Sequence, residues 1–196
     1  MFYEVEVMDH VRVSPKYFNM DIKDAAFKCL SEQLEDKVSR TLGVVVCVVG
    51  IESIGDGILI PGDGASYYEM KFKVITFKPE MQEIVNGEVS EITDFGAFMN
   101  IGPIDGMIHI SQTMEDYVSF SESKVLTGKE SKKVLKTGDL CRARIVAVSF
   151  KETDNPRIGL TMRQPQLGSF KWLKEDIDKQ KNAVKKTVEQ KPKGKK

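Results

Sequence analysis

The chain has 196 residues, 41% of them hydrophobic and 30% charged, and its 29 Lys and Arg residues balance 29 Asp and Glu residues. This composition fits an ordinary folded protein with one large or two small domains. Three scattered cysteines exclude a disulfide framework, and no CxxC pair supports a zinc site. No secretory signal opens the sequence, and its longest apolar run, residues 44–49, is too short to span a bilayer. We therefore expect a cytoplasmic protein.

The charges are distributed unevenly along the chain. Residues 1–81 carry a net charge of −4 and residues 82–165 a net charge of −2, whereas residues 166–196 carry +6. A basic segment of this kind fits an anionic partner such as RNA or DNA, or it serves as a solubilising tail. Both readings stay open.

Residues 1–80 predict an α+β domain with one helix on a curved antiparallel sheet. Residues 2–13 and 67–77 alternate between apolar and charged side chains, as strands with one buried face do. Apolar side chains recur every three or four positions over residues 21–40, which predicts an amphipathic helix.

Capping residues and glycines predict where that helix begins and ends. Asn19 or Asp21 can cap its N-terminus, and Gly43 is expected to close it. The apolar residues 44–49 predict a strand buried on both faces. The glycine-rich residues 50–64 predict a region rich in turns that contains a short strand at residues 58–60 and a turn at residues 62–64.

Residues 81–165 predict an all-β domain. Short strands separated by Gly, Asp, Asn and Pro turns are expected near residues 85–93, 96–101, 106–110, 139–149 and 157–162. Five short strands in about 80 residues fit a closed barrel of the OB-fold type. The long connection at residues 112–138 predicts an inserted hairpin, which is a natural place for a specialised contact.

The C-terminal part divides into two segments. Residues 166–183 form an amphipathic segment, which we expect to be helical from Phe170 onward. Residues 184–196 are rich in lysine and nearly free of apolar side chains, so we expect a disordered basic tail.

The most specific signal lies in residues 87–111, which read as a curled β-ribbon. We expect Phe95, Phe98 and His109 to lie near one another on the outer surface of the barrel. The two phenylalanines are three positions apart, and a bulge at Gly96 would bring both outward. Exposed rings on a small barrel stack against unpaired bases, so these residues predict RNA binding. A phenylalanine in a strand is also a common core residue, and this alternative stays open.

Cations on the later strands would complete a groove for a single strand, with rings for the bases and cations for the phosphates. The candidates are Arg142, Arg144, Lys151, Arg157 and Arg163. By alternation, Arg142 and Arg144 share one face of their strand.

Catalytic patterns are missing from the sequence. Its one DxD motif, residues 176–178, lies on the predicted helix, where the two carboxylates diverge by about 200° and do not share an ion. The glycine turns at residues 55–57 and 62–64 are not followed by the GK[ST] of a phosphate loop. We therefore expect no catalytic residue, no metal and no cofactor.

Taken together, these segments resemble known proteins. Residues 87–112, 136–145 and 157–165 resemble the RNA-binding OB-fold domain named after ribosomal protein S-one. In the first domain, the resemblance rests on residues 1–3, 55–57, 61–65 and 77–79, the last running into residues 85–89. Over about residues 1–175 the chain resembles the larger stalk subunits of multisubunit DNA-directed RNA polymerases, above all the archaeal form, known as E-prime.

The resemblance implies a non-catalytic subunit of a nucleotidyltransferase complex. Such a subunit pairs with a small helical subunit, F, and docks on the polymerase core through its N-terminal domain. Its barrel binds emerging single-stranded RNA, and the pair assists open-complex formation and processivity and contacts initiation factors. The resemblance also implies that Phe95, Phe98, His109 and Arg157 occupy RNA-contacting positions. Two departures suggest a weak RNA contact or one on another face: the insertion at residues 112–138 and the acidic charge of the barrel.

The resemblance also directs attention to two surfaces for protein partners. For docking on the core we select the glycine-rich stretch, with Gly55, Gly57, Pro61, Gly62, Asp63 and Gly64. An exposed apolar seam is expected at the domain junction, near Phe77, Pro79, Ile84 and Val85.

Two alternatives use the same barrel. One is an RNA-binding component of an RNA-decay assembly of the exosome type, which normally carries a different N-terminal domain. The other is a translation initiation factor subunit, in which the barrel would come first rather than second.

Overall fold

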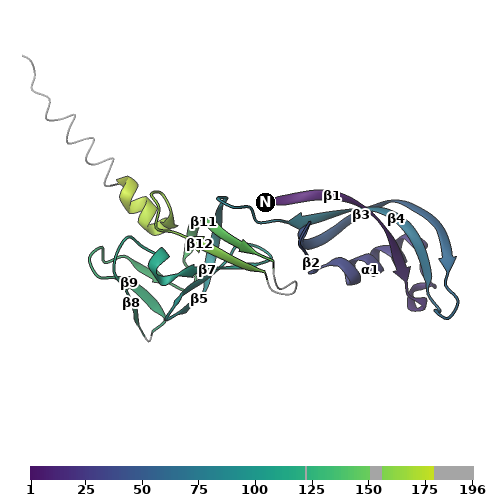
Figure 1. Ribbon diagram of the computed structural model, residues 1–196, viewed down its shortest axis with the longest axis horizontal. Coiled ribbons are helices and arrows are strands. Elements are labelled where there is room, and N and C mark those ends of the chain that lie inside the picture. Colours follow the sequence, from purple (N-terminus) through teal and green to yellow (C-terminus); the bar gives the residue numbers. More distant parts are fainter. Residues whose placement is uncertain (122, 151–155, 179–196) are drawn as a thin grey trace, which may run out of the picture. The chain divides into compact units, whose positions relative to one another are not determined.

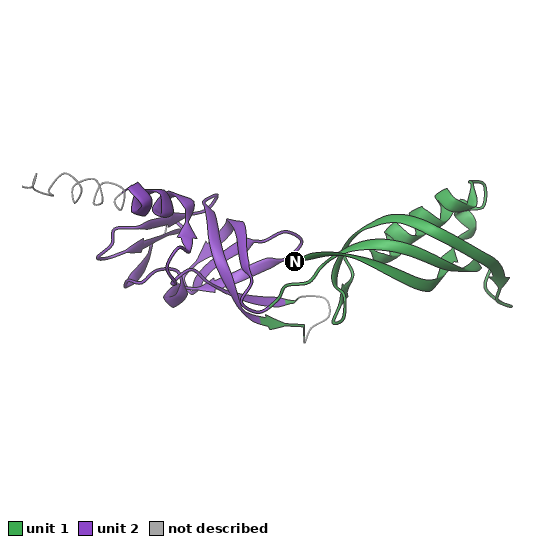
Figure 2. Ribbon diagram, turned by 90° about the horizontal axis from the view of Figure 1, so that it is seen from above, with its two compact units in different colours: residues 1–80, 148–156 green, residues 81–147, 157–196 purple. Residues whose placement is uncertain are grey.

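The computed structural model describes residues 1–121, 123–150 and 156–178. The chain divides into two compact units, Met1–Glu80 with Val148–Pro156 (unit 1) and Met81–Ala147 with Arg157–Lys196 (unit 2) (Figure 2). The candidate cation Lys151 and the predicted tail at residues 184–196 lie outside the described residues.

Unit 1 is a four-stranded antiparallel sheet with one helix along it (Figure 1). In the order of the sheet, the strands are β1 (Phe2–Val13), β4 (Ser66–Phe77), β3 (Gly43–Leu59) and β2 (Val38–Ser39). A short 3-10 turn, η1 (Pro15–Tyr17), leads to the helix α1 (Ile22–Leu34). The predicted α+β architecture is confirmed.

The helix packs on the sheet through the small side chains of its apolar stripe. Its buried residues, Ala25, Ala26, Cys29 and Leu30, are at most 2% exposed and pack against Val11, Val13, Val45, Val48, Met70, Phe72 and Val74. The Asp21 carboxylate accepts a hydrogen bond of 3.3 Å from the backbone N–H of Lys23, so Asp21, not Asn19, caps the helix.

The helix is shorter than predicted, and Gly43 does not close it. It ends at Leu34, because Asp36 takes a positive φ of 63° and the chain then enters β2. Gly43 instead opens β3 with a φ of +83°. A Cβ there would lie 2.3 Å from the carbonyl oxygen of Phe77, so the close approach of β3 to the end of β4 requires glycine.

Residues 50–57 form part of a strand rather than the predicted turns, and the short strand predicted at residues 58–60 is confirmed at Ile58 and Leu59, where it continues β3. The strand β3 pairs with β4 from Val44 opposite Phe77 to Leu59 opposite Ser66, and four register shifts along it absorb extra residues. The predicted burial of residues 44–49 on both faces is also wrong, since Val49 is 50% exposed. The helix covers only one face of the sheet.

The other face of this sheet carries a ladder of opposite charges across three strands. Lys73 lies 2.7 Å from Glu52 and 3.9 Å from Glu4, and Lys71 lies 2.7 Å from Glu6 and 3.5 Å from Glu52. Cross-strand pairs of this kind support the register of a hydrated face. The ladder therefore keeps the solvent side of the sheet polar.

The turn at residues 60–65 is tied to β1 through Asp63. The Arg12 guanidinium donates two hydrogen bonds to the Asp63 carboxylate, at 2.8 and 2.7 Å. The Tyr67 hydroxyl and the Ala65 N–H donate to the same carboxylate, at 2.8 and 3.2 Å. These donors stabilise the ionised form and hold the pKa of Asp63 well below its usual range.

Unit 2 is a closed five-stranded barrel, as predicted. Its strands are β5 (Ile84–Thr93), β6 (Gly96–Asn100), β7 (Asp105–His109), β11 (Leu140–Ser149), whose last two residues fall in unit 1, and β12 (Arg157–Thr161). The sheet order is β12–β7–β6–β5–β11–β13, and a further pairing of β12 with β11 closes it. The added strand β13 (Gly168–Ser169) pairs with β11.

Alternate residues of these strands fill the barrel. Its interior residues are Val89, Ile92, Ala97, Met99, Ile108, Cys141, Ala143, Ile145, Ile158 and Leu160, each at most 2% exposed. Burial raises the pKa of the Cys141 thiol to about 12, which keeps the thiol protonated and makes Cys141 a core residue.

The predicted apolar seam is wrong for three of its four residues. Phe77 is buried in unit 1, where its ring centroid lies 5.0 Å from that of Phe2. Pro79 is buried as well. Val85 points into the barrel while its neighbour Ile84 points outward, as strand alternation requires, so of these four residues only Ile84 is exposed.

The insertion is a three-stranded antiparallel sheet rather than the predicted hairpin. It follows the 3-10 turn η2 (Ile110–Gln112) and contains β8 (Val118–Ser121), β9 (Val125–Gly128) and β10 (Val134–Lys136), in the order β10–β9–β8. Residues 170–178 are helical, as expected. Within the described ranges, no helix has the length and apolar character needed to cross a membrane.

Closure of the barrel requires a bare backbone at Gly87. A Cβ there would lie 2.2 Å from the carbonyl oxygen of Asn100. We predict that Gly87→Ala destabilises unit 2 by about 1–3 kcal/mol, measured by urea denaturation, because β5 would be forced away from β6. Gly50→Ala is the matched control, since a Cβ at Gly50 meets no atom within 4 Å. Equal midpoints for the two variants would contradict the prediction.

The bond between Arg12 and Asp63 makes a prediction about pH. Because the pKa of Asp63 is depressed, its ionised form stabilises the turn at neutral pH, and this contribution is lost only as the pH falls through the native value. We predict that Arg12→Ala raises the pKa of Asp63 toward the usual value of about 3.9. The carbon chemical shift of the carboxylate, followed by NMR over an acid titration, measures it. Lys16→Ala, which removes a partner of Glu32 instead, should leave this titration unchanged.

Candidate RNA-binding surface

Phe95 and Phe98 lie together on the outside of the barrel. Phe95 is 47% exposed and lies in the turn between β5 and β6, and Phe98 is half-buried on the outward face of β6. Their ring centroids are 6.0 Å apart, with an angle of 88° between the ring planes. The predicted bulge at Gly96 is not what brings them together. Phe95 belongs to the turn, so strand alternation does not apply to it.

Gly96 has a different function, which is to let β6 approach β7. A Cβ at Gly96 would lie 2.1 Å from the carbonyl oxygen of Ile108. Its register partner on β7 is His109, and the next outward pair is Phe98 with Met107. The bare backbone at Gly96 therefore leaves the His109 side chain open beside the two rings. We call Phe95, Phe98 and His109 the ring platform.

Hydrogen bonds fix the proton of the His109 ring. The backbone N–H of Ser111 donates to His109 Nδ1 at 3.3 Å, and the Ser111 hydroxyl lies 2.8 Å from the same nitrogen. Nδ1 is thus an acceptor, which assigns the proton of the neutral ring to Nε2. The exposed side of the ring can donate one hydrogen bond to a ligand.

Beside the ring platform, the outward face of β12 carries little side-chain bulk. Gly159 is the parallel register partner of Met107 and carries no side chain. Two residues earlier on the same face is Arg157, which is exposed at the start of β12. Arg157 therefore lies two strands away from Phe98, within the surface on which a base stacked on the rings would lie.

Arg142 and Arg144, on β11, do not join the ring platform. Arg142 donates from Nε to Asn86 Oδ1 at 3.2 Å, and its guanidinium lies 5.4 Å from the centroid of the Phe170 ring. Arg144 faces outward in register with Ile84. Both arginines lie on β11, which pairs with the first half of β5. The rings lie on the side of β6, which pairs with the second half of β5.

One cation at the ring platform was missed from the sequence. Lys124, in the turn between β8 and β9, lies 3.1 Å from the Glu91 carboxylate, and Glu91 is the register partner of Phe98. The insertion thus reaches the edge of the rings across 33 positions of sequence. A lysine in a turn carries no local signal of this contact, so only the tertiary fold could reveal it.

The comparisons with known proteins agree with this architecture. Residues 9–64 match the SHS2 domain found in the N terminus of Rpb7p/Rpc25p/MJ0397, and residues 78–149 match the S1 RNA binding domain. The chain is 37% identical to the DNA-directed RNA polymerase subunit Rpo7 of Sulfolobus acidocaldarius, over 91% of this chain and 98% of that protein.

More distant relatives come from eukaryotes. The chain is 26% identical to the DNA-directed RNA polymerase II subunit RPB7 of Glycine max, over 86% of this chain and 96% of that protein. It is 27% identical to the RNA polymerase III subunit RPC8 of Bos taurus, over 78% of each chain.

Removing the two phenyl rings of the ring platform should measurably weaken RNA binding. If the rings stack on bases, Phe95→Ala with Phe98→Ala should weaken binding of a single-stranded oligoribonucleotide by about 1–3 kcal/mol per lost base, measured by fluorescence anisotropy. Phe27→Ala is the control, because Phe27 is an exposed phenylalanine of unit 1. A double variant that keeps its melting temperature and its RNA affinity would rule out stacking.

Proposed function

Because the chain belongs to the family of RNA polymerase subunits that includes archaeal Rpo7, we propose that it is the larger stalk subunit of a multisubunit DNA-directed RNA polymerase. Its similarity to Rpo7 carries this proposal, since it extends through both units and nearly the whole of that relative. The relatives are named as polymerase subunits, which favours this function over the RNA-decay alternative. In this proposal, the chain itself does not catalyse RNA synthesis and is a cytoplasmic component of the polymerase complex.

In this function, the barrel receives emerging single-stranded RNA. The ring platform supplies two stacking surfaces and one hydrogen-bond donor, and Arg157 supplies a cation on the same outward face. This combination tolerates any sequence, because every base has a π-face. It suits a protein that must hold many different transcripts.

Unit 1 docks on the polymerase core in our proposal, and its apolar tip is the contact. Ile58, Leu59 and Ile60 are exposed at the end of β3, directly before the turn that Asp63 fixes to Arg12. Exposed apolar side chains in a row are typical of a protein interface. Four hydrogen bonds to Asp63 hold this turn, so the tip is ordered before it meets the core.

The predicted docking residues lie in two places, inside β3 and in the turn that follows it. Gly55 and Gly57 lie inside β3, and a Cβ at Gly57 would lie 2.6 Å from the Tyr68 ring, so they serve the sheet. The turn residues Pro61, Gly62, Asp63 and Gly64 shape the tip. Pairing with a small helical subunit, contacts with initiation factors, and support of open-complex formation and processivity complete the proposal.

Co-purification tests this function. A tagged chain expressed in its own organism should recover the polymerase core and a small helical subunit. Leu59→Asp should reduce recovery of the core by at least tenfold while RNA affinity stays unchanged, because a charge at the tip opposes burial. Met8→Asp is the matched control, since Met8 is 69% exposed and Leu59 71%. Recovery of exosome or ribosomal components instead of polymerase would refute the proposal.

A further inference from the structure

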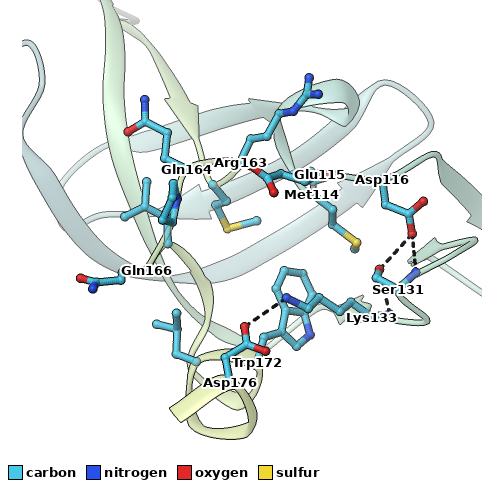
Figure 3. Close-up of a pocket in the computed structure, with 15 residues that line it drawn as sticks. Met114, Glu115, Asp116, Ser131, Lys133, Arg163, Gln164, Gln166, Trp172 and Asp176 are labelled. Atoms are coloured by element: carbon cyan, nitrogen blue, oxygen red, sulfur yellow. Dashed lines mark hydrogen bonds and ion pairs between the residues drawn. The ribbon is translucent and has the colours of Figure 1, made fainter. Parts of the chain in front are cut away.

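A cavity of about 350 Å³ lies between the barrel, the insertion and the C-terminal helix of unit 2 (Figure 3). Its floor is apolar and formed by Met114, Met162, Leu167 and Trp172, all of them buried. Gly168 permits this packing, because its φ is +115° and a Cβ there would lie 2.8 Å from the Trp172 ring. A buried apolar floor of this size suits the flat body of a small ring system.

The rim of the cavity carries polar groups with unused hydrogen-bonding capacity. Within the part of the chain that the structure describes, the side chains of Glu115, Arg163, Gln164 and Gln166 make no hydrogen bond or ion pair. Asp116 differs, because it accepts hydrogen bonds from the Ser131 hydroxyl and backbone and builds the wall (Figure 3). The amide groups of Gln164 and Gln166 carry donors and acceptors and the Arg163 guanidinium carries donors, which are the groups that hydrogen-bond to the edge of a nucleobase.

A second cavity of about 320 Å³ adjoins the first and shares Ser131, Lys133 and Trp172 with it. It is lined by lysines from two elements, Lys132, Lys133 and Lys136 at β10 and Lys171 on the helix, and by the carboxylates of Asp139 and Glu175. Two of them are already paired, since Lys133 lies 3.3 Å from Asp176 and Lys171 lies 2.6 Å from Asp139.

Lys132 and Lys136 have no acidic partner among the described residues. Their ammonium groups are therefore available to an external anion. Among the described residues, the ring platform is bordered by the carboxylates of Glu91 and Asp94, and Lys124 beside it is paired with Glu91. Two unpaired lysines that a phosphate backbone could contact therefore lie on this side of unit 2, beside the carboxylates of Asp139 and Glu175.

We propose that these two adjoining cavities, the lysine groove, form a second RNA-binding site beside the ring platform. One unpaired base enters the apolar cavity, where Arg163, Gln164 and Gln166 contact its edge. The neighbouring phosphates lie on Lys132 and Lys136. This inference rests on the proposed RNA binding of the barrel.

Neutralising the two free lysines tests the groove. In the full chain, Lys132→Asn with Lys136→Gln should lower the affinity for a 16-nucleotide single strand by about tenfold near 0.1 M salt. It should also reduce the slope of log affinity against log salt by about 1.4, since each single-strand phosphate contact contributes about 0.7. Asparagine suits position 132, where φ is +53°. Binding of a 4-nucleotide RNA, long enough for the ring platform alone, should not change.

Lys23→Gln with Lys37→Gln is the matched control, because it removes two exposed lysines from unit 1. Crosslinking of a 16-mer that contains 4-thiouridine should label peptides 113–116 and 162–167 in the wild type. The inference is overturned if the groove variant binds RNA like the control, or if it loses polymerase subunits instead of RNA, which would make the groove a protein-docking site. If the wild type binds neither RNA, the proposed RNA function of the barrel fails as well. If only the Phe95 and Phe98 variant is weakened, that function stands and the groove does not.

Discussion

Strand β5 pairs with a different neighbouring strand along each of its two halves, and the barrel closes only because β5 can bend between these two pairings. Its first half pairs with β11 and its second half with β6, and Glu88 has a register partner on both sides. A barrel of five strands needs this stagger, since its strands must tilt to close. At the bend, Gly87 faces the Asn100 carbonyl at a distance that no side chain permits, and a register shift between Val89 and Glu91 adds further twist. The backbone at this point fixes which residues of every other strand face outward.

The binding surfaces follow from that closure. With β5 bent, β6 and β7 are presented side by side, so Phe98 and Met107 point outward as a pair and Phe95 covers them from the turn. The same bend separates the arginines of β11 from the rings, because they pair with the other half of β5. Apart from Arg157 on β12, cations for a phosphate backbone then come from elements outside the five strands. In unit 2 those elements are the insertion and the C-terminal helix, which meet where the Trp172 indole donates to the Val134 carbonyl at 3.2 Å.

Much of this fold could be predicted from local pattern, and the errors have physical causes. The strands at residues 2–13 and 67–77 and the cap at Asp21 follow from alternation and side-chain chemistry, which act within a few residues. The glycines of β3 suggested turns because a sequence does not show that β4 runs beside them along their whole length. The role of Phe95, Phe98 and His109 in RNA binding stays a prediction, but their placement on the outside of the barrel was predicted because they cluster in sequence. Lys124 and the lysine groove were not, since they depend on contacts between segments far apart in the chain. Asp63 was assigned to docking, but its hydrogen bonds show a local structural role.

The net charge of a domain does not predict its binding partner when opposite charges lie on different parts of its surface. Residues 82–165 sum to −2, and carboxylates border the rings, whereas the groove holds the unpaired Lys132 and Lys136 together with the carboxylates of Asp139 and Glu175. On the proposed function this separation has a use. Stacking on the ring platform depends little on base identity or salt, whereas the lysines attract the backbone and weaken as salt rises. A transcript that must keep moving is better held by two modest contacts than by one strong one, because each can release while the other stays bound. The acidic border of the rings keeps the first contact weak, and the carboxylates that lie among the lysines of the groove keep the second contact weak as well.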